Sequence, residues 1–161
     1  MEPFVHGANH ESWRRAGTES VLLAAGLAAA CRLAKERPCA DQLAALTTYF
    51  WAQLRAVFGS RVVLNGHGTR RLPNTLNVSF PGHLGQDVLD RLDDVAASTG
   101  SACHTGTHVV SPVLAAMGVT EEVGLGAIRF SLGRPTTHEE IDVVIEKLKL
   151  KLKLDVAERT H

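Results

Sequence analysis

In some stretches of the chain apolar residues recur every three or four positions, as in helices, and in others apolar and polar residues alternate, as in strands. A run rich in Ala and Leu follows Thr18, whose hydroxyl suits a helix N-cap, so we expect a helix over residues 18–36. Pro38 ends this helix. Asp41 is placed to cap a second helix over 41–58, in which apolar residues recur every three or four positions.

Four short segments have the composition or the alternation that is typical of strands. In the last of them, Ile128 and Phe130 share one face while Arg129 lies on the other. Only one face of such a strand is expected to contact a core. The four predicted strands are residues 61–65, 76–80, 95–97 and 126–132.

Three further helices are predicted in the second half of the chain. Residues 85–92 have helical spacing, and a short helix is expected to begin at Pro112. Thr137 and Glu140 have the spacing of a capping box, which opens a C-terminal helix. Leu and Lys alternate strictly over 147–154, but the composition favours helix, and we predict helix there. This order of elements predicts an α/β (α+β) fold with a small, mostly antiparallel sheet covered by helices.

Composition narrows the class of protein. The chain has 161 residues with 45% apolar content, enough for one domain with a core. Its 17 basic and 17 acidic residues cancel, which argues against nucleic acid or an anionic membrane as partner. The 3 cysteines form no CxxC pair, so we expect no disulfide framework and no metal site. Without a signal-like N-terminus or a membrane-spanning apolar run, we expect a cytoplasmic protein.

One cysteine stands where exposed chemistry is expected. Cys103 lies between Gly100 and Gly106, among small hydroxyl residues, shortly after the strand predicted at 95–97. A loop carried on a rigid element can present a thiolate to a substrate, and a reactive cysteine needs such access. The local sequence leaves open a second interpretation, a small buried residue in a Gly- and Ser-rich turn.

Four motifs follow one another in a fixed order. They are Arg15-Ala16-Gly17-Thr18-Glu19, Arg71-Leu72-Pro73-Asn74-Thr75-Leu76-Asn77, Gly100-Ser101-Ala102-Cys103 and Ile128-Arg129-Phe130-Ser131-Leu132-Gly133-Arg134-Pro135. Together they resemble signatures of the cysteine desulfurase and selenocysteine lyase family, which belongs to the class V aminotransferases. The resemblance covers the chain from about His6 onward. In that family these motifs lie in the C-terminal part of an enzyme with the aspartate aminotransferase fold.

The resemblance implies a division of the chain and a cofactor. Residues 18–161 would form the C-terminal small domain, and residues 1–17 would be a remnant of the connection to a large domain. The implied cofactor is pyridoxal 5'-phosphate, and the implied substrate is L-cysteine or L-selenocysteine, which would leave as alanine. The Schiff-base lysine of the family lies in an N-terminal domain, and neither Lys35 nor the C-terminal lysines have a matching context. We therefore expect this chain alone to be inactive.

The resemblance also implies roles for four residues. Cys103 would be the nucleophile that takes sulfur or selenium as a persulfide or selenopersulfide. Arg129 would hold the substrate α-carboxylate, a bidentate task that suits a guanidinium, and its competing role is a solvent-facing strand residue. Thr18 would reach the cofactor phosphate of a partner subunit, with a helix cap as the competing role. Asn74 is a substrate-binding candidate, although the residue type favours a turn former after proline.

Three functions stay open at this point. The chain could act as a desulfurase or lyase within a homodimer or beside a full-length subunit. It could instead be a non-catalytic dimerisation or interaction module that contacts such a subunit or a sulfur acceptor protein. The third function is a thiol sulfur carrier that uses Cys103 alone.

Overall fold

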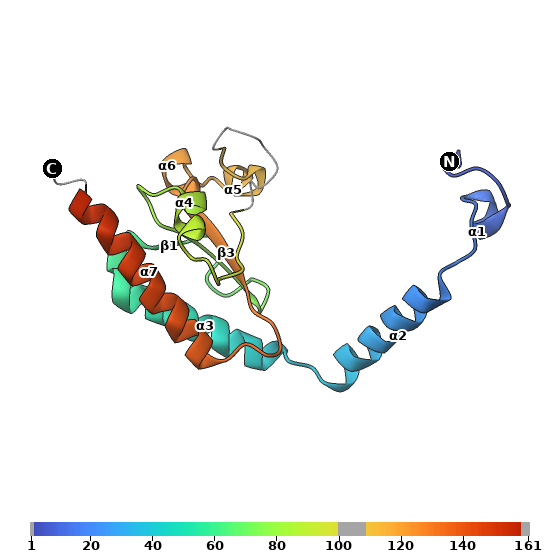
Figure 1. The fold of residues 1–161 in the computed structure, drawn as a ribbon, viewed down its shortest axis with the longest axis horizontal. Helices are drawn as coiled ribbons and strands as arrows, with labels where there is room; N and C mark the ends of the chain where they lie inside the picture. Colours follow the sequence, from blue (N-terminus) through green and yellow to red (C-terminus); the bar gives the residue numbers. More distant parts are fainter. Residues whose placement is uncertain (1, 100–108, 159–161) are drawn as a thin grey trace. The chain divides into compact units, whose positions relative to one another are not determined.

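The computed structural model of the chain describes residues 2–99 and 109–158, with side chains as far as residue 152 (Figure 1). The chain divides into two compact units, Met1–Pro38 and Cys39–His161. None of the helices in the described ranges combines the length and the hydropathy that crossing a membrane requires.

The first unit contains α1 (His10–Trp13) and α2 (Val21–Glu36). The N-cap of α2 is Ser20, whose hydroxyl accepts a hydrogen bond from the Leu23 N–H at 3.4 Å. The prediction that Thr18 caps this helix was therefore wrong, because the extended backbone of Ser20 brings a hydroxyl nearer to the first free N–H groups. No residue of α2 is buried.

The second unit is built on a three-stranded antiparallel sheet in the order β1-β2-β3. The strands are β1 (Val63–Leu64), β2 (Thr75–Ser79) and β3 (Ala127–Ser131). Three of the four predicted strands are present, so the expected α/β fold with a small antiparallel sheet is confirmed. The predicted strand at 95–97 was wrong, because only Ser98, just beyond it, makes a single antiparallel bridge.

Two long helices, α3 (Ala40–Phe58) and α7 (His138–Glu158), pack against each other and supply apolar side chains to the core on one face of the sheet (Figure 1). The helix α3 begins at Ala40 with Cys39 at the N-cap position, so the prediction that Asp41 caps it was wrong. The core residues recur at helical spacing on both helices and alternate along the strands. Among them are Leu43, Leu46, Phe50 and Leu54 of α3, Ile141, Ile145, Leu148 and Leu152 of α7, and Leu76, Val78, Ile128 and Phe130 of the strands.

The start of α7 and its Lys–Leu repeat behave as predicted. The Glu140 N–H donates to the Thr137 hydroxyl at 3.2 Å, and the Thr137 N–H donates to the Glu140 carboxylate at 3.0 Å, which is a capping box. Within the repeat, Leu148 and Leu152 are buried, whereas Leu150 is 62% exposed. A separation of four residues keeps the first two on one face of a helix.

Four short helical segments connect these elements. Two of them, α4 and α5, match predicted helices within a few residues. The η1 segment and α6 have too few residues to show a helical period, and the sequence pattern did not predict them. The four are η1 (Gly59–Arg61), α4 (Gly85–Asp90), α5 (Pro112–Ala116) and α6 (Glu121–Gly124).

Candidate functional site

A row of four polar residues crosses the face of the sheet opposite α3 and α7. In the register of β2 and β3, Asn77 is the partner of Arg129. Asn65 continues β1 and donates its backbone N–H to the Asn77 carbonyl at 3.0 Å. On the outer side of β3, Ser98 forms an antiparallel bridge with Arg129. The order across the sheet is therefore Asn65, Asn77, Arg129 and Ser98, and we call these residues the polar row.

The side chain of Arg129 is exposed, while its backbone is held firmly. Its N–H donates to the Ser98 carbonyl at 2.7 Å, and its carbonyl accepts from the Ser98 N–H at 3.1 Å. Its neighbours Ile128 and Phe130 are buried in the core, so the predicted alternation is confirmed. Among residues 2–99 and 109–158, the guanidinium has no carboxylate partner. The side chain is thus available to an anion.

Cys103 itself lies outside the described residues. The described chain reaches Thr99, whose hydroxyl lies 3.5 Å from the side-chain oxygen of Gln86, and it continues from Val109. Ser98, which precedes Cys103 by five residues in the sequence, lies beside Arg129. The segment that leads to Cys103 therefore begins next to the candidate carboxylate-binding residue.

Asn74 lies just before β2 and bonds to the end of β3. Its side-chain N–H donates to the Leu132 carbonyl at 3.4 Å, and its backbone carbonyl accepts from the Leu132 N–H at 2.8 Å. Its side-chain oxygen accepts from the Thr75 hydroxyl at 3.2 Å. These contacts are those of the structural role that the residue type favours. Its role as a substrate contact stays a prediction.

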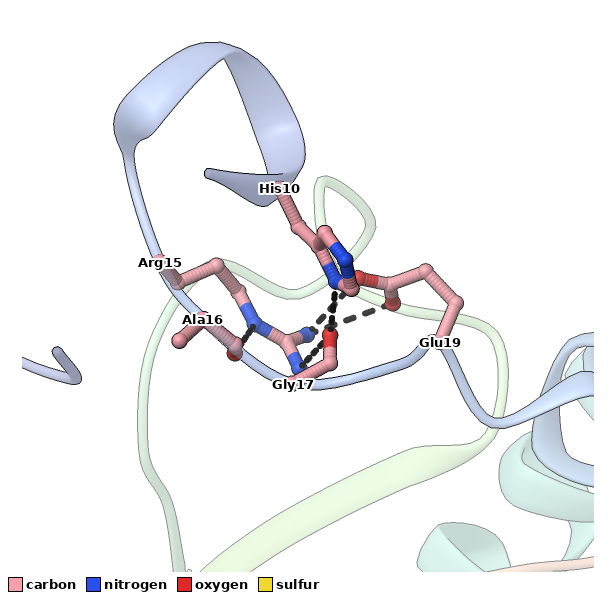
Figure 2. Close-up of polar contacts among 5 residues, drawn as sticks. All are labelled: His10, Arg15, Ala16, Gly17 and Glu19. Carbon is pink, nitrogen blue, oxygen red and sulfur yellow. Dashed lines mark hydrogen bonds and ion pairs between the residues drawn. The ribbon is translucent and has the colours of Figure 1, made fainter. Parts of the chain in front are cut away.

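Thr18 is exposed in the first unit, directly after Gly17, whose φ of +95° lies in the left-handed region. Figure 2 shows polar contacts of its sequence neighbours: the Arg15 guanidinium pairs with Glu19 at 3.0 Å and donates to the Gly17 carbonyl at 3.3 Å. The Nδ1 atom of His10 lies 2.8 Å from the same carbonyl. These contacts involve the two sequence neighbours of Thr18, Gly17 and Glu19, while Thr18 itself is exposed.

The sequence pattern did not single out the network around Asn65. Asn65 is only 6% exposed, and its amide nitrogen donates to the side-chain oxygen of Asn77 at 2.7 Å and to the Ser79 hydroxyl at 2.8 Å. Its backbone carbonyl accepts from the Arg71 guanidinium at 3.1 Å. Burial lowers the pKa of Arg71 from its ordinary value. An open hollow of about 230 Å³, lined in part by Arg71, Asn77 and His67, lies beside this network.

The residues of the chain fit the implied cofactor only in part. An exposed hydroxyl at Thr18 and a free guanidinium at Arg129 are the right groups for a phosphate and a carboxylate. A lysine is needed as well, and in the second unit Lys147, Lys149 and Lys151 all belong to α7. That helix contributes to the core on the sheet face opposite Arg129. The described lysines of this unit therefore do not complete a pyridoxal phosphate site.

Two pairs of histidines have a separation of four residues, the spacing of metal ligands on a helix. They are His6 with His10 and His104 with His108. The second pair lies outside the described residues. Within the described ranges, no group of three or more His, Cys, Asp or Glu side chains is arranged to hold a metal ion.

Comparison with known proteins gives one family. The family model described as aminotransferase class-V matches residues 5–144. Cysteine desulfurase IscS of Colwellia psychrerythraea is 41% identical over 151 residues, which cover 92% of this chain and 37% of that protein. The IscS protein of Pectobacterium atrosepticum is 40% identical over the same shares of both chains. The chain thus spans about 37% of the length of these curated relatives.

Solved structures agree with this assignment. A NifS-like protein superposes with a TM-score of 0.80 at 29% identity, covering 96% of this chain and 40% of that chain. A NifS-like protein from Rickettsia africae superposes with a TM-score of 0.74 at 29% identity, covering 91% and 39%. The likeness extends over most of the chain, and it spans less than half of either solved protein.

Proposed function

The chain belongs to the aminotransferase class V family, and from this membership we propose that it supplies the C-terminal part of a pyridoxal 5'-phosphate-dependent cysteine desulfurase. The relatives at 40–41% identity are named cysteine desulfurases, which favours this activity within the family. The observation that carries the proposal is the bridge between Ser98 and Arg129. It sets the segment leading to the candidate nucleophile beside the candidate carboxylate-binding residue. Residues 18–161 would be the small domain and residues 1–17 its connection.

Cys103 would be the group that accepts sulfur. Its thiolate attacks the sulfur of L-cysteine, an S–S bond forms, and the bond between that sulfur and the substrate β-carbon breaks. The carbon keeps the bonding electrons, takes up a proton and leaves as alanine, so that Cys103 retains a persulfide. L-selenocysteine would react in the same way and give a selenopersulfide.

Arg129 would orient the substrate for this attack. A guanidinium can give two parallel N–H donors to the α-carboxylate, which fixes the direction of the rest of the molecule. Its support is the exposed side chain on a strand whose backbone bonds to neighbours on both sides. Asn74 would contribute to this site by its hydrogen bonds between the start of β2 and the end of β3. Direct contact with the substrate would be its second role.

Thr18 would donate its hydroxyl to the phosphate of the cofactor in a partner subunit. When bound, pyridoxal phosphate supplies an electron sink for the substrate carbon. The lysine that holds this cofactor would come from another part of the assembled enzyme. The α7 helix contributes to the core on the opposite side of the sheet from Arg129, and Lys35 lacks the sequence context of the family's lysine.

The proposed enzyme works as an assembly. Because Thr18 would act across a subunit boundary, the chain would form a homodimer or pair with a full-length subunit. The persulfide would pass to a sulfur acceptor protein. A balanced charge and the absence of CxxC pairs favour action in the cytoplasm, away from nucleic acid and membranes.

The test adds the part of a relative that has no counterpart in this chain. We would combine the purified chain with the remainder of the Colwellia psychrerythraea cysteine desulfurase, pyridoxal phosphate and L-cysteine, and measure alanine and the mass of Cys103 peptides. The proposal expects alanine together with one added sulfur on Cys103. Cys103→Ser should lose the added sulfur, whereas Cys31→Ser and Cys39→Ser should keep it.

Other outcomes of this experiment point to other functions. Stable assembly with unmodified Cys103 and no alanine would overturn the desulfurase proposal and favour an interaction module. Sulfur on Cys103 only when an intact desulfurase is present as donor would favour a sulfur carrier.

A further inference from the structure

The buried amide of Asn65 fixes the orientation of its neighbour in the polar row. An asparagine amide nitrogen carries two hydrogens, and here they have two acceptors, the side-chain oxygen of Asn77 and the Ser79 hydroxyl. Asn65 is 6% exposed and Ser79 is fully buried, so leaving either group unpaired would cost free energy. The side-chain oxygen of Asn77 is therefore held toward Asn65, on the β1 side of the sheet.

The amide nitrogen of Asn77 must then face the other way, toward β3. Both backbone polar groups of Arg129 bond to Ser98, so Asn77 and Arg129 form a pair without hydrogen bonds between them. In such a pair the two side chains lie on one face with their Cβ atoms close together. The Asn77 amide nitrogen and the Arg129 guanidinium are thus neighbours at the centre of the polar row.

These two groups cannot satisfy each other, because both are donors. Within the described ranges no side chain or carbonyl accepts from the Asn77 amide nitrogen, and no carboxylate pairs with Arg129. A carboxylate has two oxygens and about four lone-pair directions, which can accept from both side chains at once. The pair of donors is therefore arranged for a single carboxylate between them.

We propose that Asn77 and Arg129 together bind the substrate carboxylate, and that Asn65 is the positioning residue that aims the Asn77 amide at it. This inference rests on the proposed function, because that function supplies an amino acid as ligand. It adds a second binding residue and explains why a buried asparagine lies at the end of β1. An oxygen at the place of the Asn77 amide nitrogen would repel the same carboxylate.

The test follows the two side chains separately by NMR. The ¹⁵N-labelled full chain is titrated with L-alanine, which carries the carboxylate of the proposed product, and with L-alaninamide, which lacks it. L-alanine should shift the Asn77 side-chain amide and the Arg129 Nε signals with one common dissociation constant, and L-alaninamide should shift neither. Asn77→Ala should weaken L-alanine binding about tenfold, as expected for one lost hydrogen bond to a charged group.

Two further variants complete the experiment: a matched control, and a variant in which residue 65 accepts a hydrogen bond where Asn65 donates one. Ser131→Ala removes an exposed hydroxyl from the same face of β3 and should leave the dissociation constant unchanged. Asn65→Asp replaces the amide nitrogen of residue 65, a donor, by a carboxylate oxygen, an acceptor of the same shape. The Asn77 side chain should then turn so that its amide nitrogen donates to this carboxylate. The Asn77 signal should then stop responding to L-alanine while the Arg129 signal still responds, a difference that general charge repulsion would not produce.

The outcomes separate the inference from the proposed function. A shift at Arg129 alone, unaffected by Asn77→Ala, would overturn the shared site and leave Arg129 as a sole carboxylate-binding residue. No shift at either residue would overturn both the shared site and the carboxylate role of Arg129. An Asn77 response that persists in Asn65→Asp would overturn the positioning role of Asn65.

Discussion

Ser98 and Arg129 exchange both of their backbone hydrogen bonds, at 2.7 Å and 3.1 Å. This bridge extends the sheet by one residue beyond β3, five positions before Cys103 in the sequence. It joins two residues that are 31 positions apart in the sequence, Ser98 and the candidate carboxylate-binding residue Arg129.

Ser98→Pro should loosen this connection, because proline has no N–H to donate to the Arg129 carbonyl. A single hydrogen bond contributes about 1 kcal/mol, so hydrogen exchange at the Arg129 amide should become about fivefold faster. Ser98→Ala keeps the backbone donor and should leave the exchange rate unchanged. Equal rates in all three proteins would contradict the bridge.

Local patterns were enough to predict most elements and the outward direction of Arg129. Buried and exposed residues alternate from Ile128 to Ser131, and the capping box before α7 depends on two residues only three positions apart. The Lys–Leu repeat alternates as a strand does, and its helix was predicted because the composition favours helix. Each of these features is decided within a few residues of the chain.

The polar row could not be predicted in the same way. Asn65 and Asn77 are separated by a loop, and only the register of β1 and β2 brings their side chains to 2.7 Å. The type of residue gave no signal either: an asparagine after a strand, such as Asn65, is typical of a turn, and Asn77 occupies a polar position of an alternating strand. Ser98 was also missed as a partner of Arg129, because one isolated bridge leaves no periodic pattern.

Phe50→Ala should destabilise the second unit strongly. Phe50 is 2% exposed, and its ring meets that of Phe130 edge to face with centroids 5.0 Å apart. Truncating a buried phenylalanine costs about 3–5 kcal/mol of the free energy of unfolding, which urea unfolding would measure. Phe4→Ala is the matched control, because Phe4 is 97% exposed, and it should change stability little.

Acid should weaken the contact between α7 and the segment before Ser98. Lys147 pairs with Asp94, and this hydrogen bond lowers the pKa of Asp94 from its ordinary value. A lowered carboxyl pKa stabilises the fold above the ordinary value, and the contribution is lost as pH falls through the lowered one. Lys147→Met should return the pKa of Asp94 toward its ordinary value, as followed by NMR titration.

The control for this prediction is Lys149→Met. Lys149 pairs with Glu146 on the same helix at 3.0 Å, so its loss should leave the Asp94 titration as it is. The stability gap between the native chain and Lys147→Met should be widest near neutral pH and should close in acid. A gap that stays constant with pH would show that packing of the lysine, and not its charge, is responsible.

The single tyrosine of the chain offers a direct reading of the contact between α3 and α7. The Tyr49 hydroxyl donates to the Asp142 carboxylate at 2.6 Å. This hydrogen bond raises the pKa of Tyr49 from its ordinary value, and burial and nearby negative charge add smaller contributions in the same direction. Its stabilising effect is present below the ordinary tyrosine pKa and is lost as pH rises through the raised one. Asp142→Asn should lower the pKa of Tyr49 in an ultraviolet titration, and Glu139→Gln should lower it less, because its charge is the smallest contributor. If Asp142→Asn left the titration unchanged, the hydrogen bond between the two helices would be absent in solution.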